Sequence, residues 1–337
     1  MKLLIPFLVS LNVVFATCIH ESEVYGANIA ELEKSYSVFI EEDGKYFSSD
    51  KLSIIPTQRY HVQLNQKSEL SKKKNNGDFS AYNRKYIEYY TYPRLVNYLK
   101  EIKSKVHAIN YQFEKVGSSL AGRDLIYLGP EVIDPNKKTI VMFGRHHGDE
   151  HTANWIIEGF LNEYLSRGMN NEFQLILYPM INPDGAMKQT RYNLNNRDLN
   201  RAWTNQSGKD EIVSIHAHLK NKIKNLKNIV IALDMHGSWD EDFFYRVERS
   251  YRGRSFYNMQ SEFINQLARY DSWQAGNIIH SNGHPGMARI VLINHYNLNA
   301  LTHETIKNIP LRNNRGRSKG DLVLQGEAIV DAITDIY

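Results

Sequence analysis

The chain contains a single cysteine, Cys18, so it can form no internal disulfide. Apolar residues make up 42% of the chain and charged residues 23%, a balance typical of a folded globular protein and not of a disordered one. Its 337 residues are enough for one large domain, or for a large domain with a small one beside it.

The chain also lacks a basic stripe. The net charge is +4, and the basic residues are scattered except at Lys72-Lys73-Lys74. That triplet lies in the polar segment "SELSKKKNNGDFS", which is interpreted as a solvated linker. With neither a basic face nor a recognition motif, the chain is not expected to bind nucleic acid.

No apolar run is long enough to span a bilayer. The longest one near the N-terminus, from Leu3 to Phe15, suits the core of a signal peptide, and Val14 and Ala16 are small residues at cleavage positions. In a second interpretation, "FATC" resembles a lipoprotein box and Cys18 becomes a lipid anchor. We expect an exported protein, either periplasmic or secreted, or a lipoprotein held at a membrane.

Three segments divide the chain. Residues 1–17 are assigned to the signal peptide, 18–80 to an N-terminal extension and linker, and 81–337 to the main domain. The extension holds two strand-like runs, "YSVFIEE" and "YHVQL", and an Asp-Gly turn in "EDGKYF". No repeat is visible, and we expect a monomer.

Helical and strand-like runs alternate in the main domain. The run "YPRLVNYLKEIKSKV" predicts a helix with Leu95, Tyr98, Leu99, Ile102 and Val106 on one face. The predicted strands are "TIVMF", "FQLILYPMI", "IVIAL" and "NALT". A helix with one apolar face is predicted between the first two, ending near Gly168. We therefore expect an α/β fold with a mixed, mostly parallel central sheet flanked by helices, and polar chemistry at the carboxyl ends of the strands.

Metal-ligand residues follow two of these strands. His147 and Glu150 are three residues apart in "HHGDE", and His236 follows a second strand in "IVIALDMHG". Each has an ordinary alternative, a surface histidine near a glutamate or a hydrogen-bonded loop histidine. Together they form a His₂Glu set, a usual arrangement for catalytic zinc. His146 is interpreted as a neighbour of this set because His147 has the H-x-x-E spacing.

A polar segment follows the strand in the middle of the domain. It reads "NPDGAMKQTRYNLNNRDLNRAW" and concentrates arginine and asparagine within a short stretch. Arginine offers a planar fork that matches a carboxylate and a permanent charge for an oxyanion. The alternative interpretation is an exposed polar loop.

These motifs, in this order, resemble the zinc carboxypeptidase (funnelin) family. "NPDG…R…DLNRAW" stands between H-x-x-E and the strand-end histidine, and "VGSSLAGRDLIYLG" is similar to an early strand pair of the family. "YTYPRLVNYL" resembles its opening helix, and "NALTHET" the strand that carries its catalytic glutamate. The resemblance covers residues 86–337.

The resemblance implies one Zn²⁺ per chain, bound by His147, Glu150 and His236. It implies that Glu304 is the general base and that Arg191 polarises the scissile carbonyl.

It further implies that Asn200 and Arg201 hold the terminal carboxylate of the substrate. Arg289, fifteen residues before the catalytic glutamate, falls where the family selects the departing side chain, and a cation there favours an acidic residue. A structural salt bridge is the alternative for this arginine.

Three positions depart from the family pattern. Asn196 stands where a glycine is frequent, although asparagine tolerates a left-handed backbone. Asn282 stands where many members have a tyrosine, with His280 and His284 nearby. Asp149 replaces an arginine that contacts upstream substrate residues, which puts extended-peptide recognition in doubt.

The implied function is a zinc-dependent carboxypeptidase. It would act on peptides with an acidic C-terminus, or on cell-wall stem peptides with a carboxylate-bearing leaving group. Two alternatives stay open: a deacylase of small acylated amino acids, and an inactive zinc-binding relative.

Overall fold

The computed structural model describes residues 89–205, 210–238, 242–271, 277–306, 317 and 319–337, together with four N-terminal strands. These strands are β1 (Ala16–His20), β2 (Tyr36–Glu42), β3 (Lys45–Ser48) and β4 (Arg59–Leu64). They form an antiparallel sheet in the order β1-β4-β2-β3. The strands predicted from "YSVFIEE" and "YHVQL" are thereby confirmed.

The predicted signal-peptide core lies outside the described residues, as does the predicted linker. Cys18 falls within β1, whose backbone alone is described. The leader, the lipid anchor and the domain boundaries therefore stay predictions. Among the helices of the described residues, none is both long and apolar enough to cross a membrane.

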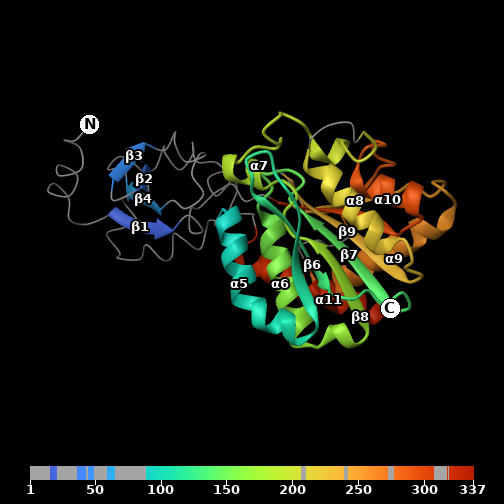
Figure 1. Ribbon diagram of the computed structural model, residues 1–337. Coiled ribbons are helices and arrows are strands. Elements are labelled where there is room, and N and C mark those ends of the chain that lie inside the picture. Colours follow the sequence, from blue (N-terminus) through green and yellow to red (C-terminus); the bar gives the residue numbers. More distant parts are fainter. Residues whose placement is uncertain are drawn as a thin grey trace.

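The main domain is built on an eight-stranded sheet (Figure 1). Its strands are β5 (Tyr111–Ser118), β6 (Asp124–Pro130), β7 (Lys138–Gly144), β8 (Phe173–Tyr178), β9 (Ile229–Ser238), β10 (Phe243–Arg246), β11 (Ile278–His280) and β12 (Ala300–Ile306). They lie in the order β11-β10-β12-β9-β7-β8-β6-β5. The centre, from β12 through β9 and β7 to β8, is parallel, whereas β5, β6 and β10 pair antiparallel with their inner neighbours. The expected mixed α/β fold is confirmed.

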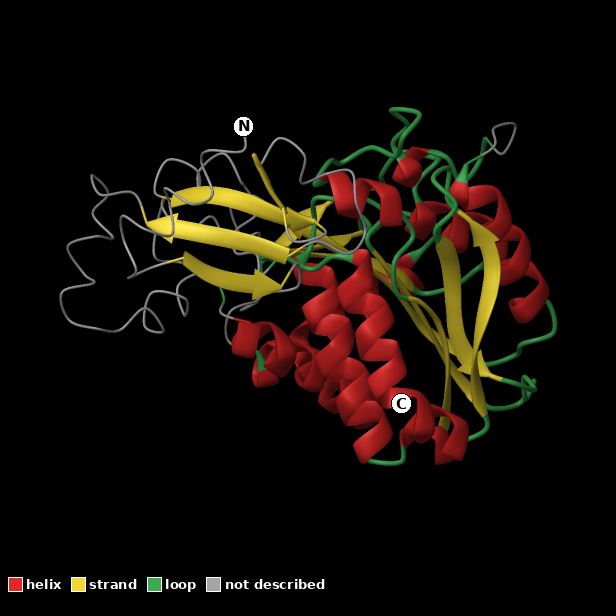
Figure 2. Cartoon of the chain, turned by 60° about the vertical axis from the view of Figure 1, so that its left-hand side comes forward, coloured by secondary structure: helices red, strands yellow, loops and turns green. Residues whose placement is uncertain are grey.

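Helices cover both faces of this sheet (Figures 1 and 2). They are α5 (Tyr92–Ala108), α6 (Thr152–Ser166), α7 (Pro183–Lys188), α8 (Glu211–Ile223), α9 (Arg254–Tyr270), α10 (Ala288–Tyr296) and α11 (Lys319–Ile336), with short 3₁₀ turns η4 (Met169–Asn171) and η5 (Leu199–Arg201).

Side chains of the central strands alternate between two apolar layers. On β7, Ile140 and Met142 pack with α5, α6 and α11, while Val141 and Phe143 pack with α8 and α10. Successive side chains of a strand point to opposite faces, so a strand buried on both faces reads as a continuous apolar run. This is why "TIVMF" could be recognised in the sequence.

The predicted face of α5 is confirmed. Its buried residues are Leu95, Tyr98, Leu99, Ile102 and Val106. The helix begins after Thr91, whose side chain accepts a hydrogen bond from the backbone N–H of Arg94, and Pro93 occupies the first turn, where no N–H is needed.

The single apolar face predicted for α6 is wrong in part. Residues 152–161 are all buried because the sheet covers one side of the helix and α11 the other. The two helices approach closely at glycines: a Cβ on Gly159 would lie 2.1 Å from the carbonyl oxygen of Val323, and one on Gly326 2.1 Å from that of Ile156. The helix ends before Gly168, which has φ +64° as the predicted stop requires.

Two strand ends also differ from prediction. β8 ends at Tyr178, because Pro179 follows and has no N–H to donate. β9 continues to Ser238, so His236 belongs to the strand rather than to the loop after it. In the parallel pair of β9 and β12, His236 lies directly beside Glu304. The sheet therefore brings these two side chains together.

A cluster of buried ion pairs holds the C-terminal end of β12 in place. Arg317 pairs with both oxygens of Asp271 at 2.9 and 2.6 Å and with Asp242 at 2.5 Å. Asp242 also accepts a hydrogen bond from the backbone N–H of Ile306, the last residue of β12. The cluster thus fixes the strand just beyond Glu304.

Candidate active site

A buried arginine shapes the loop after β7. Arg145 has φ +61°, and its guanidinium donates to the carbonyl oxygens of Gly148 and Tyr90 and to the side-chain oxygen of Asn154. A Cβ on Gly148 would lie 2.0 Å from the carbonyl carbon of Gly185 in α7, so this position admits only glycine. The loop is consequently held in one conformation before any ligand binds. Arg145 was not among the site residues predicted from the sequence.

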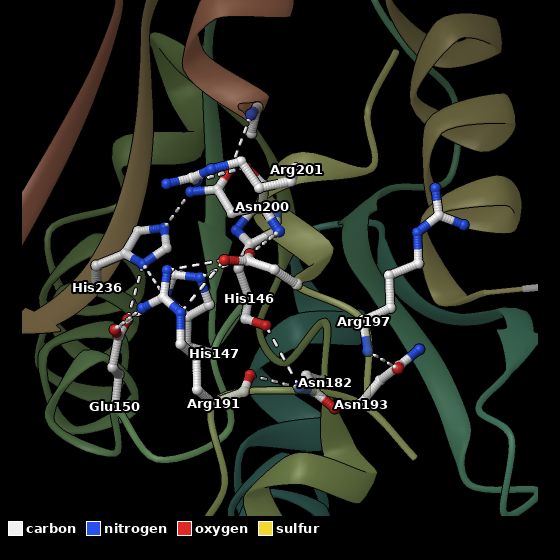
Figure 3. A network of polar contacts seen from close by, with 12 residues as sticks. His146, His147, Glu150, Asn182, Arg191, Asn193, Arg197, Asn200, Arg201 and His236 are labelled. Carbon is white, nitrogen blue, oxygen red and sulfur yellow. Dashed lines mark hydrogen bonds and ion pairs between the residues drawn. The ribbon is translucent and has the colours of Figure 1, made fainter. Parts of the chain in front are cut away.

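Three predicted ligands converge at this loop (Figure 3). Nδ1 of His147 lies 2.8 Å from Oε1 of Glu150, and Nδ1 of His236 lies 2.7 Å from Oε2. The two Nδ1 atoms are 3.2 Å apart. All three side chains are buried, and their donor atoms form a group able to hold a metal ion. Two imidazole nitrogens and a carboxylate oxygen suit zinc among the common metals.

The charges of this group favour the binding of a metal cation. Burial opposes ionisation, but His147 and His236 hold the pKa of Glu150 well below its usual range. Burial likewise opposes the charged form of His236, yet Asp234 and Glu150 raise its pKa well above the usual value. The anionic carboxylate therefore attracts positive charge, and a metal cation would displace the imidazole protons.

An aspartate carboxylate contacts Nε2 of each of the two histidines in the ligand group. Asp198 lies 3.0 Å from Nε2 of His147, and Asp234 lies 3.0 Å from Nε2 of His236. Metal-binding imidazoles usually donate their second ring nitrogen to such a group, which orients the ring and fixes its tautomer. Neither aspartate was predicted as a site residue, although Asp198 stands in "DLNR" and Asp234 in "IVIALDMHG".

Arg191 lies beside the ligand atoms. Its Nη1 is 3.2 Å from Nδ1 of His147 and 3.6 Å from Oε1 of Glu150, while Nε and Nη2 both donate to Asp198. Its side chain is 37% exposed. Asp198 therefore aims the guanidinium at the centre, and the exposed part leaves it able to meet a ligand.

Asn200 is packed into the site and Arg201 lies at its surface. Oδ1 of Asn200 accepts a hydrogen bond from the backbone N–H of Ala288, so Nδ2 faces Asp234 and His236. Arg201 is exposed and donates to the carbonyl oxygen of Asn200. The predicted pair is adjacent in space as well as in sequence. The turn before it has Asn196 at φ +56°, which confirms the left-handed backbone expected there.

Glu304 faces the ligand group from β12. Burial and, to a smaller extent, the carboxylate of Glu150 raise the pKa of Glu304 to about 7, against the opposing effect of His236. Its side chain stays partly accessible. A carboxyl group that titrates near neutral pH can both accept and return a proton.

We expect the metal-free Glu304→Gln variant to be more stable than the metal-free wild type at pH 8. Ionising Glu304 in the folded protein then costs about 3 kcal/mol, from a pKa raised above its unfolded value, and glutamine avoids this cost. The cost disappears as the pH falls through 7 toward 4.5, because the folded state then holds the proton. Thermal unfolding at pH 8 and pH 5 measures the difference, and an equal shift at both would contradict it.

Arg289 is fully buried on α10. Its Nη2 donates to the carbonyl oxygen of Ser281, whereas Nε and Nη1 have no hydrogen-bond partner. The guanidinium lies 5.5 Å from the ring of Tyr245. Burial lowers the pKa of Arg289 to about 10, so the group is still charged at neutral pH. Within the described part of the chain no ion pair joins it to a carboxylate, so the salt-bridge alternative gains no support.

Asn282, which stands in place of the family's tyrosine, and the nearby His280 lie apart from the ligands. Asn282 exchanges hydrogen bonds with Glu248, His280 accepts one from Arg246, and neither touches the ligand group. Tyr245 of β10 pairs with Thr302 and so lies on the same face of the sheet as Glu304. Burial raises its pKa, and Glu304 adds to the shift, which reflects their proximity.

Comparisons with known proteins agree with this architecture. A model of the succinylglutamate desuccinylase/aspartoacylase catalytic domain matches residues 136–289. Cytosolic carboxypeptidase 3 of Mus musculus is 26% identical over 270 residues, which are 73% of this chain and 27% of that protein. Cytosolic carboxypeptidase 2 of Mus musculus is 32% identical over 168 residues, 44% of this chain and 19% of that protein. The chain thus spans about a quarter of these relatives or less.

Solved structures show the same fold. A metallo-carboxypeptidase of Burkholderia cenocepacia superposes with a TM-score of 0.65 at 17% identity, covering 89% of this chain and 80% of that one. A metallo-carboxypeptidase of Pseudomonas aeruginosa, in complex with (2-guanidinoethylmercapto)succinic acid, gives 0.64 at 19% identity, covering 91% and 82%. The chain therefore has the fold of these metallo-carboxypeptidases, and the sheet carries the ordered motifs that resemble the zinc carboxypeptidase family.

Proposed function

We propose that this protein is a zinc-dependent carboxypeptidase that releases an acidic C-terminal residue. One observation carries the proposal: the pairing of β9 with β12 sets Glu304 beside His236, and His147 and Glu150 complete a ligand group there. A general base next to three metal ligands is the minimum equipment for hydrolysing an amide with water.

The donor set fits Zn²⁺ in number and kind, with three protein ligands as in other catalytic zinc sites. Zinc bound there would supply Lewis acidity toward an amide carbonyl and toward water. The remaining steps belong to the side chains. Glu304 takes a proton from the attacking water and passes it to the departing amine.

Arg191 and the Asn200–Arg201 pair each bind a different negatively charged group of the substrate. Arg191, already aimed at the ligand group by Asp198, stabilises the oxyanion that forms at the scissile carbonyl. Asn200 and Arg201 hold the terminal carboxylate. Such a clamp positions the last peptide bond, and only that bond, for attack.

Arg289 supports the preference for an acidic residue. Its two unpartnered nitrogens are buried, and so is the unpartnered hydroxyl of Thr302. Thr302 pairs with Tyr245 across the sheet, next to the guanidinium. Buried donors without acceptors are costly, and a substrate carboxylate would satisfy them. Peptides ending in an acidic residue and cell-wall stem peptides with a carboxylate-bearing leaving group both meet this requirement.

We expect the Arg289→Gln variant to lose about 10²-fold in kcat/KM on a peptide ending in glutamate. On the matched peptide ending in glutamine it should lose little, because the lost interaction involves the terminal side chain. Steady-state kinetics on the two peptides give the ratio. Arg269→Gln, which changes an exposed arginine of α9, serves as the control. Preference of the wild type for the glutamine peptide would remove the role of Arg289.

A second candidate is a deacylase of small acylated amino acids. The match of residues 136–289 to the desuccinylase/aspartoacylase model favours it, although Glu304 lies beyond the matched segment. Hydrolysis of N-acetylaspartate or N-succinylglutamate, without release of terminal residues from peptides, would establish the deacylase. A protein that binds zinc and cleaves neither class would be the inactive relative.

Location and assembly complete the proposal. The apolar N-terminal run supports export to the periplasm or the medium, with Cys18 as a lipid anchor in the alternative form. We propose a monomer with one zinc ion per chain.

A further inference from the structure

A series of buried polar contacts connects Trp203, His146 and Asp234 to His236. Nε1 of Trp203 lies 3.0 Å from Nε2 of His146, Nδ1 of His146 lies 2.7 Å from Oδ1 of Asp234, and Oδ2 of Asp234 lies 3.0 Å from Nε2 of His236. All four side chains are at most 2% exposed. The imidazole rings of His146 and His236 are parallel, with centroids 5.5 Å apart (Figure 3).

The indole N–H of Trp203 sets the donor and the acceptor in each of these hydrogen bonds. An indole N–H can only donate, so Nε2 of His146 must accept and the proton of that ring lies on Nδ1. Nδ1 of His146 therefore donates to Asp234. The second oxygen of Asp234 then accepts from Nε2 of His236. Nδ1 of His236 faces Glu150, and once a metal ion displaces the proton held there, the lone pair of Nδ1 is directed at the ligand group.

We propose that His146 is a positioning residue for the metal centre. With Trp203 and Asp234, it fixes the tautomer of His236 in which Nδ1 is free to bind the metal. This inference rests on the metal centre of the proposed function and not on the identity of the substrate.

Asn200 provides a check on this assignment of donors and acceptors. Its Nδ2 lies 3.0 Å from Nε2 of His236, and donation to that nitrogen would require the opposite tautomer, with the proton on Nδ1. The same amide also reaches Oδ2 of Asp234 at 3.4 Å. A charged carboxylate is the stronger acceptor. Oδ2 of Asp234 consequently accepts hydrogen bonds from both His236 and Asn200.

The same hydrogen bonds bear on a second group of possible metal ligands. His146, Asp234 and His236 form a second group with donor atoms within 4.8 Å of one another, and they share His236 with the first group. In this second group His146 has no nitrogen to offer, because Nδ1 carries a proton and Nε2 accepts from Trp203. Of the two groups found among the described residues, this second one therefore offers no site for a further metal ion.

The test is zinc affinity, measured on the full chain after metal removal by competition with a chromophoric chelator. His146→Leu should weaken zinc binding by roughly 10–100-fold, because Asp234 loses a donor and its hold on His236. His146→Asn, whose amide N–H lies near the position of Nδ1, should restore most of the affinity. Trp203→Phe keeps the aromatic contacts with Phe143 and His216 but lacks the N–H, and should weaken binding several-fold.

The double variant distinguishes an effect of Trp203 that acts through His146 from independent structural damage by the two substitutions. If Trp203 acts through His146, Trp203→Phe should cost no further zinc affinity in the His146→Leu background. Full additivity of the two losses, unchanged affinity of either single variant, or two zinc ions per wild-type chain would each overturn the proposal. Should His146→Leu fail to fold, Trp203→Phe alone decides, with melting of the metal-free protein as the check on folding. Zinc binding is measured without substrate, so a wild type that binds zinc with the help of these contacts but cleaves no peptide would refute the proposed function alone.

Discussion

Replacing Glu304 with glutamine is expected to lower kcat on a peptide substrate by about 10³-fold. Glutamine keeps the shape of the side chain but cannot take a proton from water. His147, Glu150 and His236 are untouched, so the zinc content should stay at that of the wild type. The two measurements are steady-state hydrolysis of a peptide ending in glutamate and zinc analysis of the same sample.

The combination of results decides the role of Glu304. Glu262→Gln, an exposed change on α9, controls for the loss of one carboxylate and should leave kcat unchanged. If Glu304→Gln retained full activity, another group would have to accept the proton. If activity and zinc were lost together, Glu304 would be part of the metal centre rather than its base.

Removing a ligand should have an effect of similar size by another route. His236→Ala leaves two of the three ligand side chains, and it removes the imidazole that contacts both Asp234 and Glu150 in a buried site. We expect zinc affinity to fall by more than about 10³-fold, and activity at limiting zinc to fall with it. Excess zinc should restore part of the activity.

Chelator competition and activity as a function of free zinc measure this loss. His295→Ala, which removes an exposed histidine at the end of α10, is the matched control. Wild-type zinc affinity in His236→Ala would mean that the metal binds elsewhere, and the ligand group described above would be wrong.

Much of the fold could be predicted because its signals are local. The face of α5 follows from helical spacing, and β7 and β8 follow from apolar runs that only strands buried on both faces need. The burial of α6 was predicted less accurately. α6 is buried nearly all round because α11 packs onto it across two glycines, and the spacing of residues within α6 carries no information about that partner.

The ligands could be predicted because each of their motifs follows or includes a strand end. His147 and Glu150 come after β7, and His236 lies on the neighbouring strand β9, so a parallel sheet necessarily brings them to one edge. The resemblance to the zinc carboxypeptidase family added Glu304 and the polar residues of "DLNR". No comparable signal marked Arg145, whose partners are backbone carbonyls and neutral side chains from three segments.

By itself, the sequence determined the layered α/β architecture, the identity of the ligand side chains and the class of chemistry they suit, since strand periodicity and metal-ligand types are properties of short segments. The tertiary structure alone decided which nitrogen of each histidine faces the rest of the ligand group, because that depends on Asp198, Asp234, His146 and Trp203, which approach from different loops and strands. It also decided that Arg289 is buried with unpartnered nitrogens rather than paired in a salt bridge. Hydrogen bonds between distant segments set the proton positions and the charge environment, and these exist only once the chain has folded.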